Sequence, residues 1–197
     1  MMKLNLSLAL LLAASHATAA PAIASQCKAG ETTYFNCAVK KGAKVASLCG
    51  KGDGGAGSYL QYRYGSPGKQ PEQTYPSSPR DSAMSESFFF NSQGAPNSPR
   101  ADTGVWFEYD NTFYELKYSA ELSPTGHNTT SVSQILQWNG VPSGAPRPTV
   151  CRHPRAGENL SSAGAVIEAM SPKGRMWKMS PLDVHYQPKP APQPTAD

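Results

Sequence analysis

Histidine is the side chain most often used for acid and base catalysis near neutral pH, and it is scarce in this chain. After residue 24 there are His127, His153 and His185, each beside a Gly, Pro or Asn loop signal or in the C-terminal tail. The chain has no Gly-x-Ser-x-Gly, His-Glu-x-x-His, phosphate-loop or acidic calcium-loop motif. The sequence therefore predicts no catalytic residue, no metal ligand and no cofactor. A hydrolase site assembled from residues distant in sequence stays an alternative.

Two carboxylates, Glu108 and Glu115, fall on one face of a predicted β-hairpin over residues 105–118. They do not stand opposite one another, and Lys117 shares their face. We interpret them as part of a charged, solvated face rather than as an acid and base pair.

Aromatic residues are dense in the middle of the chain and could line a groove for a glycan or an envelope protein. The alternation of side chains between the two faces of the predicted strands assigns many of these aromatic residues to a core. Trp106 and Phe113 fall on the opposite face of the hairpin and, together with Tyr59, are the candidate binding residues. The basic residues are scattered and the net charge is only +4, so no nucleic-acid partner is predicted. The oligomeric state is left open.

Four cysteines, an even number, predict two disulfides if the protein is exported. There is no Cys-x-x-Cys pair, so a zinc site is disfavoured. A first hairpin over residues 33–49 places Cys37 opposite Ala46 and Cys49 opposite Tyr34. That separation is roughly 10 Å along the strands, beyond the ~7 Å limit for a disulfide. The register thus argues against Cys37–Cys49 and favours Cys27–Cys49 with Cys37–Cys151, while Cys27–Cys37 with Cys49–Cys151 stays open.

The first 24 residues have the order of a secretory signal peptide. Lys3 precedes an apolar run over residues 4–14, small residues follow, and cleavage is predicted after Ala19 or Ala24. The apolar run is shorter than the ~20 residues that a membrane-spanning helix needs. We expect a periplasmic or secreted protein with no membrane span.

Residues 25–186 are predicted to form a single exported domain, since their number suits one hydrophobic core. Residues 187–197 are rich in proline and are expected to be a disordered tail. The domain is expected to be all-β and mainly antiparallel, either a small sandwich or a barrel. One helix is predicted near the C-terminus, over residues 157–170, where Gly164 weakens the pattern.

The predicted strands are short and are separated by Gly, Pro, Ser and Asn clusters. Asp110 and Asn111 form the turn of the clearest hairpin, because both residue types tolerate the left-handed backbone of a two-residue turn. After Asn139 and Gly140, the prolines restrict the return strand to a short or edge position before Cys151. The expected strands cover residues 33–39, 44–49, 58–64, 88–90, 105–109, 112–118 and 131–138.

The order of these segments resembles a group of uncharacterised exported bacterial proteins, which implies location and β architecture but no activity. The opening, an aromatic strand ending in Cys37 followed by a Gly turn, is also similar to periplasmic inhibitors of C-type lysozyme. That similarity implies inhibition of a cell-wall hydrolase as an alternative to the leading expectation, a non-catalytic binding or envelope-associated protein. The segments that carry the first resemblance are Glu31-Thr-Thr-Tyr-Phe-Asn-Cys37, Lys44-Val-Ala-Ser-Leu-Cys49, Tyr59-Leu-Gln-Tyr-Arg-Tyr-Gly65-Ser-Pro-Gly68, Phe113-Tyr-Glu-Leu-Lys-Tyr118 and Trp138-Asn-Gly140.

Overall fold

The computed structural model describes residues 23–39, 42–79, 87–93, 99–123, 128–140, 142 and 144–170. Their strands form two antiparallel sheets, which confirms the predicted fold class. Sheet A has the strand order β1 (Thr32–Val39), β2 (Lys44–Lys51), β3 (Tyr59–Gly65) and β4 (Gln73–Tyr75). Sheet B has the order β5 (Phe89–Gln93), β6 (Arg100–Tyr109), β7 (Thr112–Leu122), β8 (Asn128–Asn139) and β9 (Arg147–Val150).

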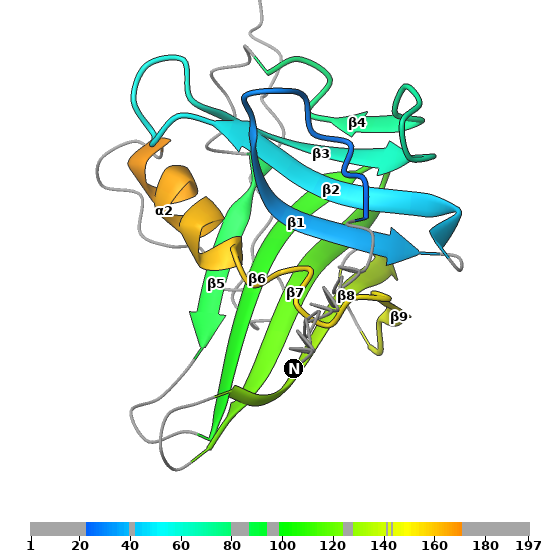
Figure 1. Ribbon diagram of the computed structural model, residues 1–197, viewed down its shortest axis with the longest axis vertical. Helices are drawn as coiled ribbons and strands as arrows, with labels where there is room; N and C mark the ends of the chain where they lie inside the picture. Colours follow the sequence, from blue (N-terminus) through cyan, green and yellow to red (C-terminus); the bar gives the residue numbers. More distant parts are fainter. Residues whose placement is uncertain are drawn as a thin grey trace, which may run out of the picture.

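The two sheets pack face to face as a β-sandwich. Figure 1 shows sheet A lying across the upper part of sheet B, with helix α2 (Leu160–Met170) beside β5. One hydrophobic core draws on both sheets and the helix, and at its centre Tyr62 of β3 contacts Phe107 of β6 with ring centroids 4.8 Å apart. The side chains that point away from this core define the outer face of each sheet.

The predicted hairpin of sheet B is confirmed in its turn and its register. Tyr109 pairs with Thr112, and Asp110 and Asn111 have φ values of 49° and 52°. Both lie in the left-handed region that a two-residue turn of this type needs. The register places Phe107 and Tyr114 in the core and Trp106 and Glu115 on the outer face.

The first hairpin of sheet A has the predicted pairing of Cys37 with Ala46, but a β-bulge at Tyr34 shifts the register beyond it. Cys49 therefore pairs with Thr33 rather than with Tyr34. A bulge adds one residue to one strand and so moves every later pair by one position. Strand β1 contains no glycine or proline that would predict this bulge.

Both disulfides have the favoured connectivity. Cys27 is joined to Cys49 over a sequence separation of 22, and Cys37 to Cys151 over 114. The Cys37–Cys151 bridge lies in the core and ties β1 to the segment that follows sheet B. The described part of the chain contains no free cysteine.

Helix α2 begins at Leu160, within the predicted range, and its buried residues face the core. Gly164, which weakens the helical pattern, has a packing role. A Cβ atom at this position would lie 2.5 Å from the ring of Phe90 on β5. Glycine therefore lets the helix approach the sheet closely.

Other expectations differ in outcome. Strand β9 is short and at a sheet edge, as predicted. Strand β4 was not anticipated, and β6 begins at Arg100, earlier than expected. None of the described helices is long and apolar enough to cross a membrane. The expected leader up to residue 22 and the tail over 187–197 lie outside the described residues.

Candidate functional site

The outer face of sheet A is covered by residues 23–31, which cross β2 and β3 (Figure 1). Beneath this segment lies a buried ion pair between Arg63 and Glu31, whose side chains are 2 % and 3 % exposed. Arg63 Nη1 and Nη2 donate to the two carboxylate oxygens of Glu31 at 2.5 and 2.7 Å. This two-point contact is the strongest geometry that such a pair can adopt.

The neighbours of the ion pair complete its hydrogen bonds. The Tyr59 hydroxyl donates to Glu31 Oε1 at 2.6 Å, and the backbone N–H of Lys28 donates to Oε2 at 2.6 Å. Arg63 Nε donates to Gln61 Oε1, and Gln61 Nε2 donates to the Pro76 carbonyl. We call Glu31, Tyr59, Gln61 and Arg63 the Arg63 network.

The hydrogen bonds that Glu31 accepts determine its pKa. Burial alone would raise it, but the hydrogen bonds from Arg63, Tyr59 and Lys28 outweigh burial and lower the pKa from 4.5 to about 2. Glu31 is thus held as a carboxylate, and every strong acceptor position on it is used. The Arg63 network fixes the N-terminal segment on sheet A and leaves no group free to bind a ligand.

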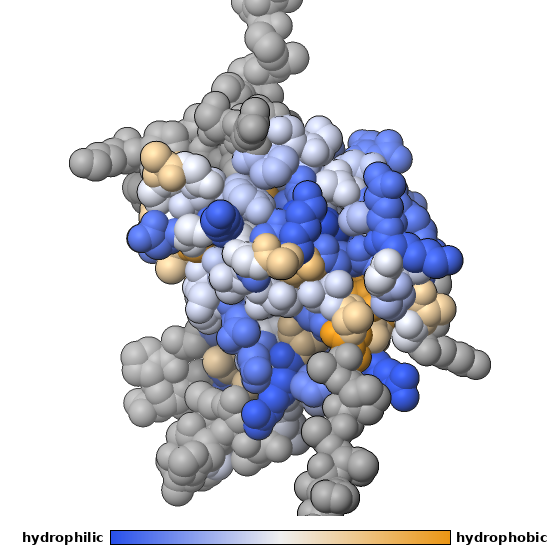
Figure 2. Space-filling view, turned by 45° about the horizontal axis from the view of Figure 1, so that its top comes forward, coloured by the Kyte–Doolittle hydropathy of each residue, from blue (hydrophilic) through white to orange (hydrophobic). Residues whose placement is uncertain are grey.

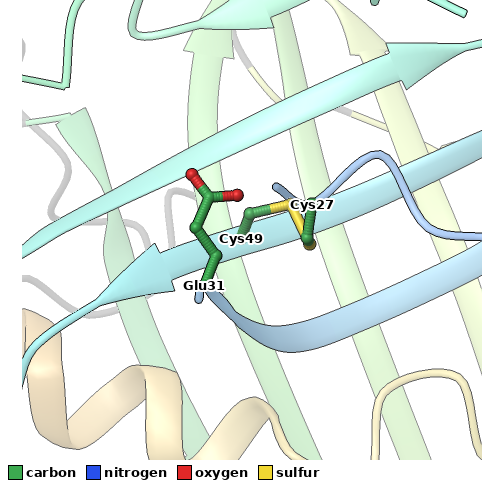
Figure 3. Close-up of side chains that lie close together, drawn as sticks. All are labelled: Cys27, Glu31 and Cys49. Carbon is green, nitrogen blue, oxygen red and sulfur yellow. A yellow bond between two sulfur atoms is a disulfide. The ribbon is translucent and has the colours of Figure 1, made fainter. Parts of the chain in front are cut away.

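Cys27, Glu31 and Cys49 form a group of potential metal ligands among the described residues, with ligand atoms within 4.8 Å of one another. Figure 3 shows the two sulfur atoms joined in a disulfide, with the Glu31 carboxylate beside them. A metal-binding cysteine must be a thiolate, and Glu31 is already paired with Arg63. The geometry does not fit a metal ion.

The outer face of sheet B is organised in cross-strand rows. One row runs Phe89, Trp106, Glu115, Leu136 from β5 to β8. The next runs Asn91, Gly104, Lys117, Gln134. The first row belongs to a small apolar cluster, in which Trp106 stacks on Trp138 with ring centroids 5.2 Å apart; its buried members are Trp106, Phe113, Leu136 and Trp138.

Glu115 is buried in this row at 6 % exposure and accepts no hydrogen bond from any described residue. Its Oε1 atom lies 2.6 Å from the point where a Cβ on Gly104 would stand, and Trp106 Nε1 lies 3.2 Å from the same point. Among the described residues, the buried Trp106 Nε1 has no hydrogen-bond partner. Gly104, Trp106 and Glu115, named here the Gly104 site, therefore combine an unpaired donor with an unpaired acid.

The charges around the Gly104 site act on Glu115 in opposite directions. Burial raises the pKa of Glu115 from 4.5 to about 7, Lys117 lowers it and Asp102 raises it. Asp102 itself is paired, with Oδ1 3.0 Å from Arg100 Nε and Oδ2 3.5 Å from Lys117 Nζ. Burial would raise the pKa of Asp102, but bonds from Ser119 and Arg100 and the charge of Lys117 lower it.

The candidate binding residues are not brought together. Trp106 and Phe113 lie on the outer face of sheet B as predicted, but at 2 % and 6 % exposure they form no open platform. Tyr59 is on sheet A, with its hydroxyl committed to Glu31. A binding role for these three stays a prediction. The interpretation of Glu115 as part of a solvated face is wrong, because the neighbouring aromatic residues bury it.

Alternation alone put Glu115 on the same face as Trp106, so the sequence contained the signal for their proximity. The sequence could not show that aromatic side chains bury the part of this face that contains Trp106 and Glu115. Of the histidines, His153 lies in an exposed turn where its Nδ1 accepts from the Arg155 N–H at 3.3 Å. His127 and His185 lie outside the described residues.

No protein-family model, curated protein or solved structure matches this chain.

Proposed function

We propose that the protein is an exported, non-catalytic binding protein of the periplasm or the extracellular space, and that it binds its ligand on the outer face of sheet B. The observation that carries the proposal is the buried Trp106 Nε1, which has no hydrogen-bond partner among the described residues, beside Glu115, which accepts no hydrogen bond from them. Buried polar groups are normally hydrogen-bonded, and leaving one unpaired costs about 1–3 kcal/mol. A bound ligand can supply the hydrogen-bond partner that such a group lacks.

Export is supported by two features. Two disulfides tie together the N-terminal segment, sheet A and the segment after sheet B, and such bonds persist in oxidising compartments. The first 24 residues have the pattern of a cleaved leader. The core and the two disulfides stabilise the sandwich. The protein can therefore stay folded although a site on one outer face lowers its free energy of unfolding.

The test is retention of envelope components on the immobilised protein, lacking its first 24 residues. Wild type and Glu115→Gln are compared, with lysozyme included as a separate probe. Glu108→Gln is the matched control, because Glu108 lies on the same hairpin but is exposed. We expect a component that wild type and Glu108→Gln retain and Glu115→Gln loses. Equal retention by all three proteins would contradict the proposed site.

A hydrolase is the second candidate, because Glu115 and Asp102 interact electrostatically and have pKa values moved apart. Carboxyl pairs of this type can supply an acid and a base. Release of reducing ends from cell-wall glycan, abolished in both Glu115→Gln and Asp102→Asn, would establish this candidate. A binding protein is expected to release none.

A further inference from the structure

The two unpaired groups of the Gly104 site differ in chemistry, and this difference restricts what can bind. The indole N–H of Trp106 can only donate a hydrogen bond, whereas an ionised Glu115 can only accept. Both atoms approach the same point above Gly104, which places them within bridging reach of one oxygen atom. That oxygen must accept from Trp106 and donate to Glu115, and a hydroxyl group does both.

Resting on the proposed function, we propose that the ligand of the Gly104 site is a neutral carbohydrate, one hydroxyl group of which accepts from Trp106 Nε1 and donates to Glu115. The row that contains Gly104 supports this ligand class. Asn91 lies beside Gly104 in this row, Gln134 lies beyond Lys117, and both are half-buried. Their amide groups offer both donors and acceptors to adjacent hydroxyl groups.

Charge favours a neutral ligand over an anionic one. The cations beside the site are already engaged, since Lys117 and Arg100 both pair with Asp102. An acidic sugar would have to break these pairs and would also face the Glu115 carboxylate. A neutral sugar needs neither change, and its apolar C–H groups can lie towards the neighbouring aromatic cluster.

The position within the sheet disfavours an extended peptide. Peptides commonly bind a sheet by adding a strand to its edge. Gly104 and Glu115 are on β6 and β7, which have strands on both sides, and the edges of sheet B are β5 and β9. Recognition at the Gly104 site must therefore use side chains, as carbohydrate recognition does.

The site opens by a movement of Glu115. Its carboxyl group must turn away from Gly104 to admit a ligand oxygen, and this uncovers the indole N–H. No hydrogen bond from a described residue holds the carboxyl group in place. Glu31 differs in this respect. Its carboxylate is held in place by hydrogen bonds from Arg63, Tyr59 and Lys28.

The experiment titrates the protein with neutral tri- and tetrasaccharides of glucose, galactose and N-acetylglucosamine, and with an acidic oligosaccharide of matched length. Binding is followed through tryptophan fluorescence, since Trp106 and Trp138 are stacked. We expect at least one neutral sugar to bind. Its affinity should fall about tenfold or more in Trp106→Phe and in Glu115→Gln and stay unchanged in Glu108→Gln. Thermal unfolding checks that each variant is folded.

Two outcomes overturn the proposal and are distinguishable. If no neutral sugar binds more tightly than about 1 mM, or the acidic sugar binds better, the ligand class is wrong. The proposed function then still stands if retention of an envelope component remains sensitive to Glu115→Gln. If a sugar binds but all variants bind it equally, the Gly104 site is not its site. The proposed function fails only if the envelope retention is also insensitive to Glu115→Gln.

Discussion

The outer faces of the two sheets each bury a glutamate, and they treat it in opposite ways. On sheet A, Glu31 receives hydrogen bonds from Arg63, Tyr59 and the Lys28 backbone, and its pKa is lowered to about 2. On sheet B, Glu115 lies against apolar side chains without a hydrogen bond from the described residues, and its pKa is raised to about 7. Both side chains are largely shielded from solvent, but hydrogen bonds from its partners lower the pKa of Glu31 and burial raises that of Glu115.

This comparison separates a structural polar cluster from a candidate binding site. A satisfied network stabilises one conformation, because every change breaks a bond. An unsatisfied pair costs folding free energy, which a ligand can recover by supplying the missing partner. Figure 2 shows a coloured surface that is mainly hydrophilic or intermediate, with small separate apolar areas.

The largest expected effect breaks the Arg63 network. Arg63→Met should destabilise the protein by about 3–5 kcal/mol, because it leaves the Glu31 carboxylate buried without its cation. Lys44→Met is the matched control, because Lys44 pairs with Glu72 at the surface and the loss of this pair should cost much less. Urea unfolding measures both. Similar losses in the two variants would show that the Arg63 network is not structural.

Smaller losses of stability are expected when one glycine of each sheet is replaced by alanine. In Gly50→Ala on sheet A, the new Cβ would meet the Tyr59 carbonyl oxygen at 2.5 Å, and the backbone cannot move away cheaply. We expect a loss of about 2–3 kcal/mol. In Gly104→Ala the nearest atom is the end of the Glu115 side chain, which can turn aside, so the loss should be under about 1 kcal/mol.

Melting of the two alanine variants side by side provides the measurement. A Gly104→Ala loss as large as that of Gly50→Ala would mean that Glu115 is held in place, contrary to the opening described for the Gly104 site.

A third prediction concerns Tyr59 in the Arg63 network. Tyr59→Phe should cost about 2 kcal/mol, because it removes one hydrogen bond to a charged group while the rest of the network remains. It should also raise the pKa of Glu31, since the hydroxyl contributes to lowering it. A side-chain carbon NMR titration of Glu31 tests this directly. An unchanged pKa would remove Tyr59 from the Arg63 network.

Much of the fold could be predicted from the sequence, because many of its turns and strands depend only on residues that are close together in the chain. The turn at Asp110 and Asn111 and the strand alternation on both sides of it depend on neighbouring residues, and the structure confirms them. The predicted register argued against Cys37–Cys49 and favoured the two disulfides that form, but it left Cys27–Cys37 with Cys49–Cys151 open. The bulge at Tyr34 and strand β4 depend on contacts between segments, which a local pattern does not contain.

The candidate site was predictable only in part. Alternation placed Trp106, Phe113 and Glu115 on one face, but it indicated neither that Phe89, Leu136 and Trp138 would bury that face nor that Gly104 would admit the carboxyl group. The Arg63 network was missed entirely, because Glu31 and Arg63 are 32 residues apart and neither has a distinctive sequence context.

The pH dependence of unfolding for wild type and Glu115→Gln tests the contrast between the two glutamates most directly. The folded state of wild type binds the Glu115 proton more tightly than the unfolded state, because burial raises the pKa from its ordinary value of 4.5 to about 7. Wild-type stability should therefore fall, relative to Glu115→Gln, as the pH rises from about 4.5 to about 7, by up to about 3 kcal/mol. A difference between the two proteins that stays constant over this range would contradict a buried, unpaired Glu115.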